Sequence, residues 1–304
     1  MTHRPDAIPS KGACIYCGDR TTALTDEHVV PFGMGGKHVL LKASCLRCNK
    51  VTSKFELDVL QELWGDARIS YGSPTRHRPK RASRTHINMV LPDQSRSIDI
   101  PVSEYPAAMV YYEMGQAGAL AGLDPSVDTS GGWKLTTVTD QQKLDAFPSK
   151  YGVSPTMKFR HVPVSFGRMM VKIGFCQILT ALDPGDFRPY CLPFLMGQRS
   201  NLSHVVGSNG AMDEPATQFG YVLRTHAFGK PDHIFLVAEV RLVANNSTPT
   251  YHVVVGDVVG RDNVASIRQK LGNPQDNVLN GWPVVIDPQM PKWTPKVWPN
   301  LASL

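Results

Sequence analysis

Two C-x-x-C pairs near the start of this 304-residue chain constrain its fold more than any other feature. The pairs are Cys14/Cys17 and Cys45/Cys48. Two thiolates separated by two residues can both reach one tetrahedral Zn²⁺ at about 2.3 Å, and two such pairs fill its coordination shell. The spacing therefore predicts a closed, structural zinc site. The alternative, two chance pairs of buried or free thiols, would make this metal-type spacing accidental.

The segment between the two pairs is longer than the commonest zinc-ribbon spacing, which leaves room for a strand pair with its own turn. Gly33-Met34-Gly35-Gly36 is the expected turn, because glycine favours sharp changes of direction. After Asn49, apolar residues recur at i, i+4 and predict a helix whose apolar face packs on the strand pair. These residues are Val51, Phe55, Val59 and Leu63, with Leu60 and Trp64 alongside.

Several short segments in this frame, taken in order, resemble the HNH endonuclease family in its zinc-stapled form. They are Cys14-Ile15-Tyr16-Cys17-Gly18, Leu24-Thr25-Asp26-Glu27-His28-Val29-Val30-Pro31, Gly35-Gly36 and Cys45-Leu46-Arg47-Cys48-Asn49. An isolated Glu-His pair would carry no information, whereas the ordered combination is specific. The resemblance covers about the first 65 residues. It implies a treble-clef-like ββα-metal fold, a β-hairpin followed by a helix, with a catalytic metal held between them.

The resemblance also implies roles for three residues. His28 would be the general base, Glu27 a ligand of the catalytic metal, and Asn49 a second ligand. Hydrolysis of a phosphodiester needs a water deprotonated near neutral pH, which suits an imidazole with a pKa of about 6.5. Carboxylate and amide oxygens suit Mg²⁺ or Mn²⁺, so either ion is the expected catalytic cofactor. Asp26 is excluded, because successive side chains on a strand point to opposite faces.

The sequence departs from the family pattern at two positions. The family usually carries a middle asparagine shortly before the second C-x-x-C, and the stretch from His38 to Ser44 has none. His38 could replace it by hydrogen bonding or by ligating metal, although an exposed loop histidine is the simpler interpretation. One helical turn after Asn49, Ser53 stands where a histidine ligand is common. Glu56 shares this helix face and could be an extra ligand, although a solvated acid is the simpler interpretation.

Positive charge is concentrated at the N-terminal end of the chain. Residues 1–90 hold 14 Lys and Arg against 8 Asp and Glu, whereas residues 91–304 hold 18 of each, so the net charge of +6 arises entirely from the first part. The densest run contains five basic residues and no acid: Arg76, Arg78, Lys80, Arg81 and Arg84. Such an arm would neutralise phosphates and release counterions. A solvated linker is the alternative interpretation.

Composition and hydropathy indicate the class of protein and the compartment in which we expect it. A 42% share of hydrophobic residues with 19% charged is ordinary for a globular protein. The chain has no run of about 18 apolar residues, so no membrane partner is expected. Met1–Asp6 lacks the apolar core of a signal peptide, and we expect a cytoplasmic protein in which thiols stay reduced. Cys176 and Cys191 are interpreted as structural thiols.

The expected organisation is α+β, with three parts. They are an HNH nuclease domain at residues 1–68, a basic linker or arm at 69–94, and a larger α+β domain with an antiparallel sheet at 95–304. Within the last part we predict helices at Ser103–Gly122, Gln141–Phe147 and Arg168–Leu182. Strands are predicted at Phe219–Arg224, His233–Val243 and Thr250–Val259, with a turn at Asn245–Pro249 between the last two.

Two function classes follow from the sequence. The first is a divalent-metal-dependent HNH endonuclease acting on nucleic acid, with DNA as the expected substrate. The second is a zinc-stabilised nucleic-acid-binding or interaction module without catalysis. The larger domain could select targets, mediate dimerisation or sense a signal. One active site per chain cuts one strand at a time, so a homodimer is one arrangement that would cut both.

Overall fold

The computed structural model describes residues 6–75, 85–91, 93, 95–213, 220–273 and 277–281, and side chains are described for these except residues 210–213. The expected basic arm, Arg76 to Arg84, lies outside the described residues. Within the described part of the chain, no helix is both long and apolar enough to cross a membrane.

The N-terminal part is a small sheet followed by a helix. Its strands are β1 (Asp6–Ile8), β2 (Leu24–His28) and β3 (His38–Cys45), in the order β1-β3-β2, with β2 antiparallel to β3. The turn after β2 contains the short helix η1 (Phe32–Met34) and ends at Gly35, whose φ of 79° favours glycine. Helix α1 (Leu46–Leu57) continues through the π-helical turn η2 (Asp58–Leu63) into α2 (Gly65–Ser70). The predicted ββα arrangement is confirmed.

The middle of the chain contains two hairpins and a helix. Strands β4 (His86–Val90) and β5 (Ser97–Pro101) pair antiparallel, as do β6 (Ala108–Glu113) and β7 (Lys134–Thr139), which follows the short helix η3 (Ser130–Gly132). Helix α4 (Gln141–Tyr151) confirms and extends a predicted helix. The helix predicted at Ser103–Gly122 is wrong, because β6 lies there. Its four central residues are all buried, and a strand buried on both faces loses the alternation that distinguishes it from a helix.

The C-terminal part is built on a five-stranded antiparallel sheet in the order β12-β9-β10-β11-β8. The strands are β8 (Val206–Asp213), β9 (Tyr221–Lys230), β10 (His233–Leu242), β11 (Thr248–Val259) and β12 (Val278–Gly281). The predicted α+β class and antiparallel sheet are confirmed. Short helices α6 (Leu192–Leu195) and η4 (Leu202–His204) precede the sheet, and α7 (Arg261–Leu271) follows β11.

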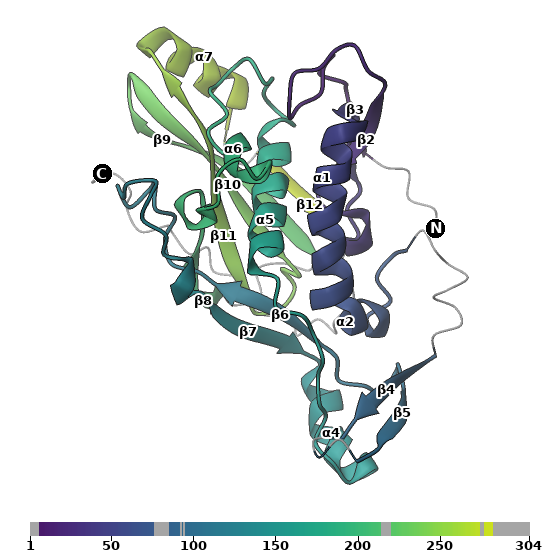
Figure 1. The fold of residues 1–304 in the computed structure, drawn as a ribbon. Helices are drawn as coiled ribbons and strands as arrows, with labels where there is room; N and C mark the ends of the chain where they lie inside the picture. The colour runs from purple at the N-terminus through teal and green to yellow at the C-terminus, as the bar shows by residue number, and fades with distance from the viewer. Residues whose placement is uncertain are drawn as a thin grey trace.

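Helix α5 (Pro163–Ile178) is the central element of the molecule, because it contacts the large sheet and also packs beside α1 (Figure 1). It begins earlier than the predicted Arg168, since Pro163 is suited to the first turn of a helix. A Cβ at Gly174 would lie 2.8 Å from the Cβ of Val253, so glycine permits the close approach of α5 to β11.

The hydrophobic core is continuous between the N-terminal and C-terminal parts. One cluster of buried residues includes Val29 and Phe55 from the first part and Phe175 and Val253 from the last. The domain boundaries predicted near residues 68 and 94 stay predictions. Because the core is continuous, the N-terminal sheet and helix α1 are supported by elements more than one hundred residues away in sequence.

Candidate active site and metal centre

The four predicted zinc ligands come together at one point. The Sγ atoms of Cys14, Cys17, Cys45 and Cys48 all lie within 4.8 Å of one another. The Sγ atoms of Cys17 and Cys45 are 3.8 Å apart, and a regular tetrahedron with Zn–S bonds of about 2.3 Å has edges of about 3.8 Å. The first pair lies in the loop before β2, while Cys45 ends β3 and Cys48 lies in the first turn of α1. The spacing and donor type fit a structural zinc ion.

The two other cysteines lie outside this cluster and are buried. Burial raises the pKa of Cys176 to about 12 and also raises that of Cys191. Both therefore remain protonated thiols near neutral pH. The Sγ of Cys176 lies 3.7 Å from the hydroxyl of Tyr16, inside the core. The burial of Cys176 and Cys191 agrees with their interpretation as structural thiols.

The side chains of the two acidic residues in the Asp26-Glu27-His28 segment lie on opposite sides of strand β2. Its pairing with β3 shifts register between Thr25 and Glu27. Asp26 is exposed and accepts a 2.9 Å hydrogen bond from the backbone N–H of Lys42, whereas Glu27 is buried on the opposite side. The side chain of Asp26 therefore does not share the surroundings of Glu27.

The imidazole of His28 is half-buried at the end of β2 and is held by the turn that follows it. Its Nδ1 lies 3.2 Å from the carbonyl oxygen of Gly36. Because a carbonyl can only accept, this contact assigns the proton to Nδ1 and, in the neutral ring, the lone pair to Nε2. A Cβ at Gly36 would lie 1.8 Å from the Val30 carbonyl oxygen. Glycine is thus needed to place the carbonyl that orients His28.

Asn49 lies within the first two turns of α1 and is half-buried. Its Oδ1 accepts a 3.4 Å hydrogen bond from the hydroxyl of Ser53, one turn later. Ser53, which stands where a histidine ligand is common in the sequence pattern, therefore lies next to Asn49. An amide oxygen with a single long hydrogen bond retains acceptor capacity.

Lys172, which the sequence analysis did not identify, contacts two acidic residues, Glu27 and Glu56. It comes from the middle of α5, and its side chain has 0% exposure. Its Nζ lies 2.8 Å from Oε1 of Glu27 and 2.9 Å from Oε1 of Glu56, and it also donates to the carbonyl oxygen of His28. Burial would lower the pKa of Lys172, but the two carboxylates outweigh burial and raise it. The lysine is therefore charged.

The interpretation of Glu56 as a solvated acid is wrong, because its carboxylate is mostly buried and paired with Lys172. A possible signal was present in the sequence: Lys172 stands inside the apolar run Met169-Met170-Val171-Lys172-Ile173. A lysine buried in an apolar helix requires an acidic partner. The sequence does not reveal which acid this is, because the partners lie on β2 and α1.

His38 is also buried, so its interpretation as an exposed loop residue is wrong. It begins β3, and its Nδ1 lies 2.9 Å from the hydroxyl of Tyr221 on β9. Its Nε2 lies 3.5 Å from a carboxylate oxygen of Asp6. Burial, with Lys37 nearby, lowers the pKa of His38. His38 thus connects the N-terminal sheet to the large sheet.

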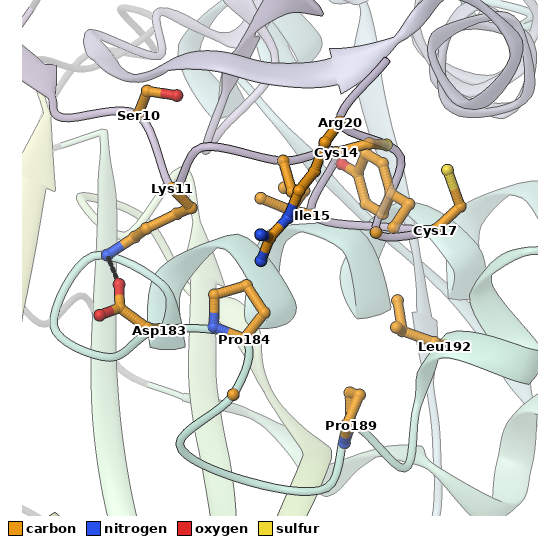
Figure 2. Close-up of a pocket in the computed structure, with 14 residues that line it drawn as sticks. Ser10, Lys11, Cys14, Ile15, Cys17, Arg20, Asp183, Pro184, Pro189 and Leu192 are labelled. Carbon is orange, nitrogen blue, oxygen red and sulfur yellow. Dashed lines mark ion pairs between the residues drawn. The ribbon is translucent and has the colours of Figure 1, made fainter. Parts of the chain in front are cut away.

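A separate open groove of about 690 Å³ runs beside the first cysteine pair (Figure 2). One wall carries Lys11, Arg20 and Cys14, and the other is the loop after α5, where Asp183 pairs with Lys11 at 2.8 Å. The lining does not include Glu27, His28 or Asn49. The groove therefore borders the zinc frame, and the candidate catalytic residues lie elsewhere.

Comparison with known proteins identifies one family. Residues 14–62 match a family model described as HNH endonuclease. The search of curated proteins and the search of solved structures found no match. The matched segment contains all four clustered cysteines together with Glu27, His28 and Asn49. Residues 14–62 of this chain therefore form an HNH nuclease-like domain with a four-cysteine site suited to structural zinc.

Proposed function

We propose that the chain is a divalent-metal-dependent endonuclease that hydrolyses phosphodiester bonds, with DNA as its substrate. The observation that carries this proposal is the contact between Nδ1 of His28 and the Gly36 carbonyl oxygen. A general base needs a fixed ring and a defined tautomer, and a hydrogen bond at one ring nitrogen supplies both. His28 would accept the proton of the attacking water at Nε2.

The residues beside His28 offer the donor atoms that a hard cation prefers. Oε2 of Glu27 is buried and has no hydrogen-bond partner among the described residues, while the Asn49 amide oxygen has one long hydrogen bond. Carboxylate and amide oxygens are suitable ligands for Mg²⁺ or Mn²⁺. We propose that Glu27 and Asn49 hold the ion. When bound, it would neutralise charge on the phosphate and on the leaving alkoxide.

The non-catalytic alternative is supported by one specific observation. Lys172 already pairs with Oε1 of Glu27, and in a pure binding module such a pair would satisfy the acid without any metal. The two functions make opposite predictions for His28, since a binding module needs no general base.

A nicking assay on supercoiled plasmid tests the proposal. We expect the parent protein to nick DNA only with Mg²⁺ or Mn²⁺, and His28→Ala to slow nicking by about a hundredfold or more, as loss of a general base does. His233→Ala is the matched control, because His233 begins β10 of the large sheet, outside the HNH nuclease-like domain and the basic arm, with a side chain that is 43% exposed, and it should keep the parental rate. Metal-dependent nicking that survives His28→Ala would refute the assigned mechanism.

Nucleic-acid binding is proposed to use the basic arm, which lies outside the described residues. Its side chains would contact phosphates and release counterions, so affinity should fall steeply with salt. Neutralising Arg78, Lys80 and Arg81 should flatten the plot of log affinity against log salt concentration by about one unit of slope per lost phosphate contact. Fluorescence anisotropy with a labelled duplex measures this slope. An unchanged slope would exclude the arm from the interface.

A further inference from the structure

The ammonium group of Lys172 contacts residues of the HNH nuclease-like domain. The lysine belongs to α5, yet its three recorded partners are the Glu27 carboxylate, the Glu56 carboxylate and the His28 carbonyl oxygen. The ammonium group forms an ion pair with each carboxylate and donates a hydrogen bond to the His28 carbonyl oxygen. The contacts fix two successive residues of β2, the same residues that we propose as metal ligand and general base.

The two oxygens of the Glu27 carboxylate lie in different surroundings. The Glu27 side chain is 6% exposed and the lysine beside it is wholly buried. Buried charges are normally paired or coordinated to metal. Oε1 of Glu27 faces Lys172, whereas Oε2 has no hydrogen-bond partner among the described residues. Lys172 therefore holds the Glu27 carboxylate at Oε1, while Oε2 can still accept a cation.

We propose that Lys172 is a positioning residue of the nuclease site: it orients the Glu27 carboxylate so that Oε2 is presented to the divalent ion, and it anchors β2 at His28. This inference rests on the proposed function. Carboxylates that bind metal are themselves hydrogen-bonded by outer groups, which set their orientation. Here the outer group comes from the C-terminal part of the chain, so the larger domain would supply part of the active site's support.

The geometry also defines a competing arrangement, in which Lys172 is itself the cation of the site and excludes the metal from Glu27. The two arrangements predict opposite changes in metal affinity. Removing a positioning lysine should weaken Mn²⁺ binding, because Glu27 loses its orientation. Removing a competing lysine should strengthen Mn²⁺ binding, because both oxygens of Glu27 become available.

The test is Mn²⁺ binding to the full-length, zinc-loaded protein, followed by electron paramagnetic resonance. We expect the parent to bind Mn²⁺ and Lys172→Met to bind it about 10–100-fold more weakly, which is the usual effect of losing an outer-shell partner. Lys270→Met is the matched control, because Lys270 is an exposed lysine on α7 and should leave the affinity unchanged. Zinc content and circular dichroism establish that each variant is folded.

A double-mutant cycle separates positioning from a general structural role. If Lys172 acts through Glu27, then Lys172→Met should weaken Mn²⁺ binding no further once Glu27→Gln is present. If Lys172→Met does not fold, Lys172→Arg replaces it in the cycle, since a guanidinium keeps the buried positive charge but presents its donors in a different, rigid geometry and should still weaken Mn²⁺ binding. Fully additive effects, an unchanged affinity in the single variant, or a tighter one would each overturn the inference.

The inference and the proposed function can fail separately. If the parent nicks DNA with Mn²⁺ but Lys172→Met keeps the parental Mn²⁺ affinity, only the role of Lys172 is refuted. If the parent neither binds Mn²⁺ nor nicks DNA, the nuclease proposal is refuted and the positioning role falls with it.

Discussion

Replacing Cys45 with serine is expected to unfold the N-terminal domain and release its zinc. Cys45 is buried, ends β3 and occupies the N-cap position of α1, and its Sγ lies in the four-cysteine cluster. Structural zinc contributes about 10–16 kcal/mol of apparent binding free energy in small zinc domains. This binding free energy is as large as the whole unfolding free energy of an ordinary domain, about 5–15 kcal/mol. A small sheet and one helix would not stay folded without it.

Zinc content by elemental analysis and melting by circular dichroism measure the effect. Cys45→Ser should lose zinc and melt at a much lower temperature, and a strong chelator should act on the parent in the same direction. Cys191→Ala is the matched control, since Cys191 is a buried thiol outside the cluster; it should retain its zinc. Full zinc content in Cys45→Ser together with the parental melting temperature would refute the four-cysteine site.

The parts of the fold that the sequence predicts well are those determined by local spacing. The two C-x-x-C pairs predict the cysteine cluster because the metal geometry allows few other arrangements. The i, i+4 apolar pattern after Asn49 predicts α1 because one face of that helix is buried and the other exposed. In both cases the information lies within a few residues of the element it specifies.

The features that the sequence does not predict depend on distant partners. The sequence predicts a helix where β6 lies, because burial on both faces hides the alternation of the strand. It predicts exposed side chains for Glu56 and His38, because their partners, Lys172 and Tyr221, lie more than one hundred residues away. Periodicity within a segment cannot reveal contacts of this range. The errors therefore fall where the N-terminal domain meets the C-terminal part.

That junction has a specific anchor in Trp64, which follows η2 and is fully buried. Its indole Nε1 donates a 2.6 Å hydrogen bond to the carbonyl oxygen of Val110 on β6. Its ring lies 5.5 Å from the ring of Tyr111 and 5.9 Å from that of Phe166 on α5, measured between centroids. One side chain thus joins the helix of the nuclease-like domain to two elements of the larger part.

Trp64→Ala should therefore destabilise the whole molecule, because its core is continuous. Truncating a buried tryptophan costs about 3–5 kcal/mol, and the hydrogen bond from the indole to the Val110 carbonyl would also be lost. Leu57→Ala is the matched control: Leu57 ends α1 with 49% exposure, and a surface substitution changes stability by about 0.5 kcal/mol or less. Urea unfolding followed by circular dichroism measures both variants. We expect Trp64→Ala to lower the midpoint of a single cooperative transition. If only one of two separate transitions moved, the N-terminal domain would fold independently, and its stability would not depend on the contacts with α5.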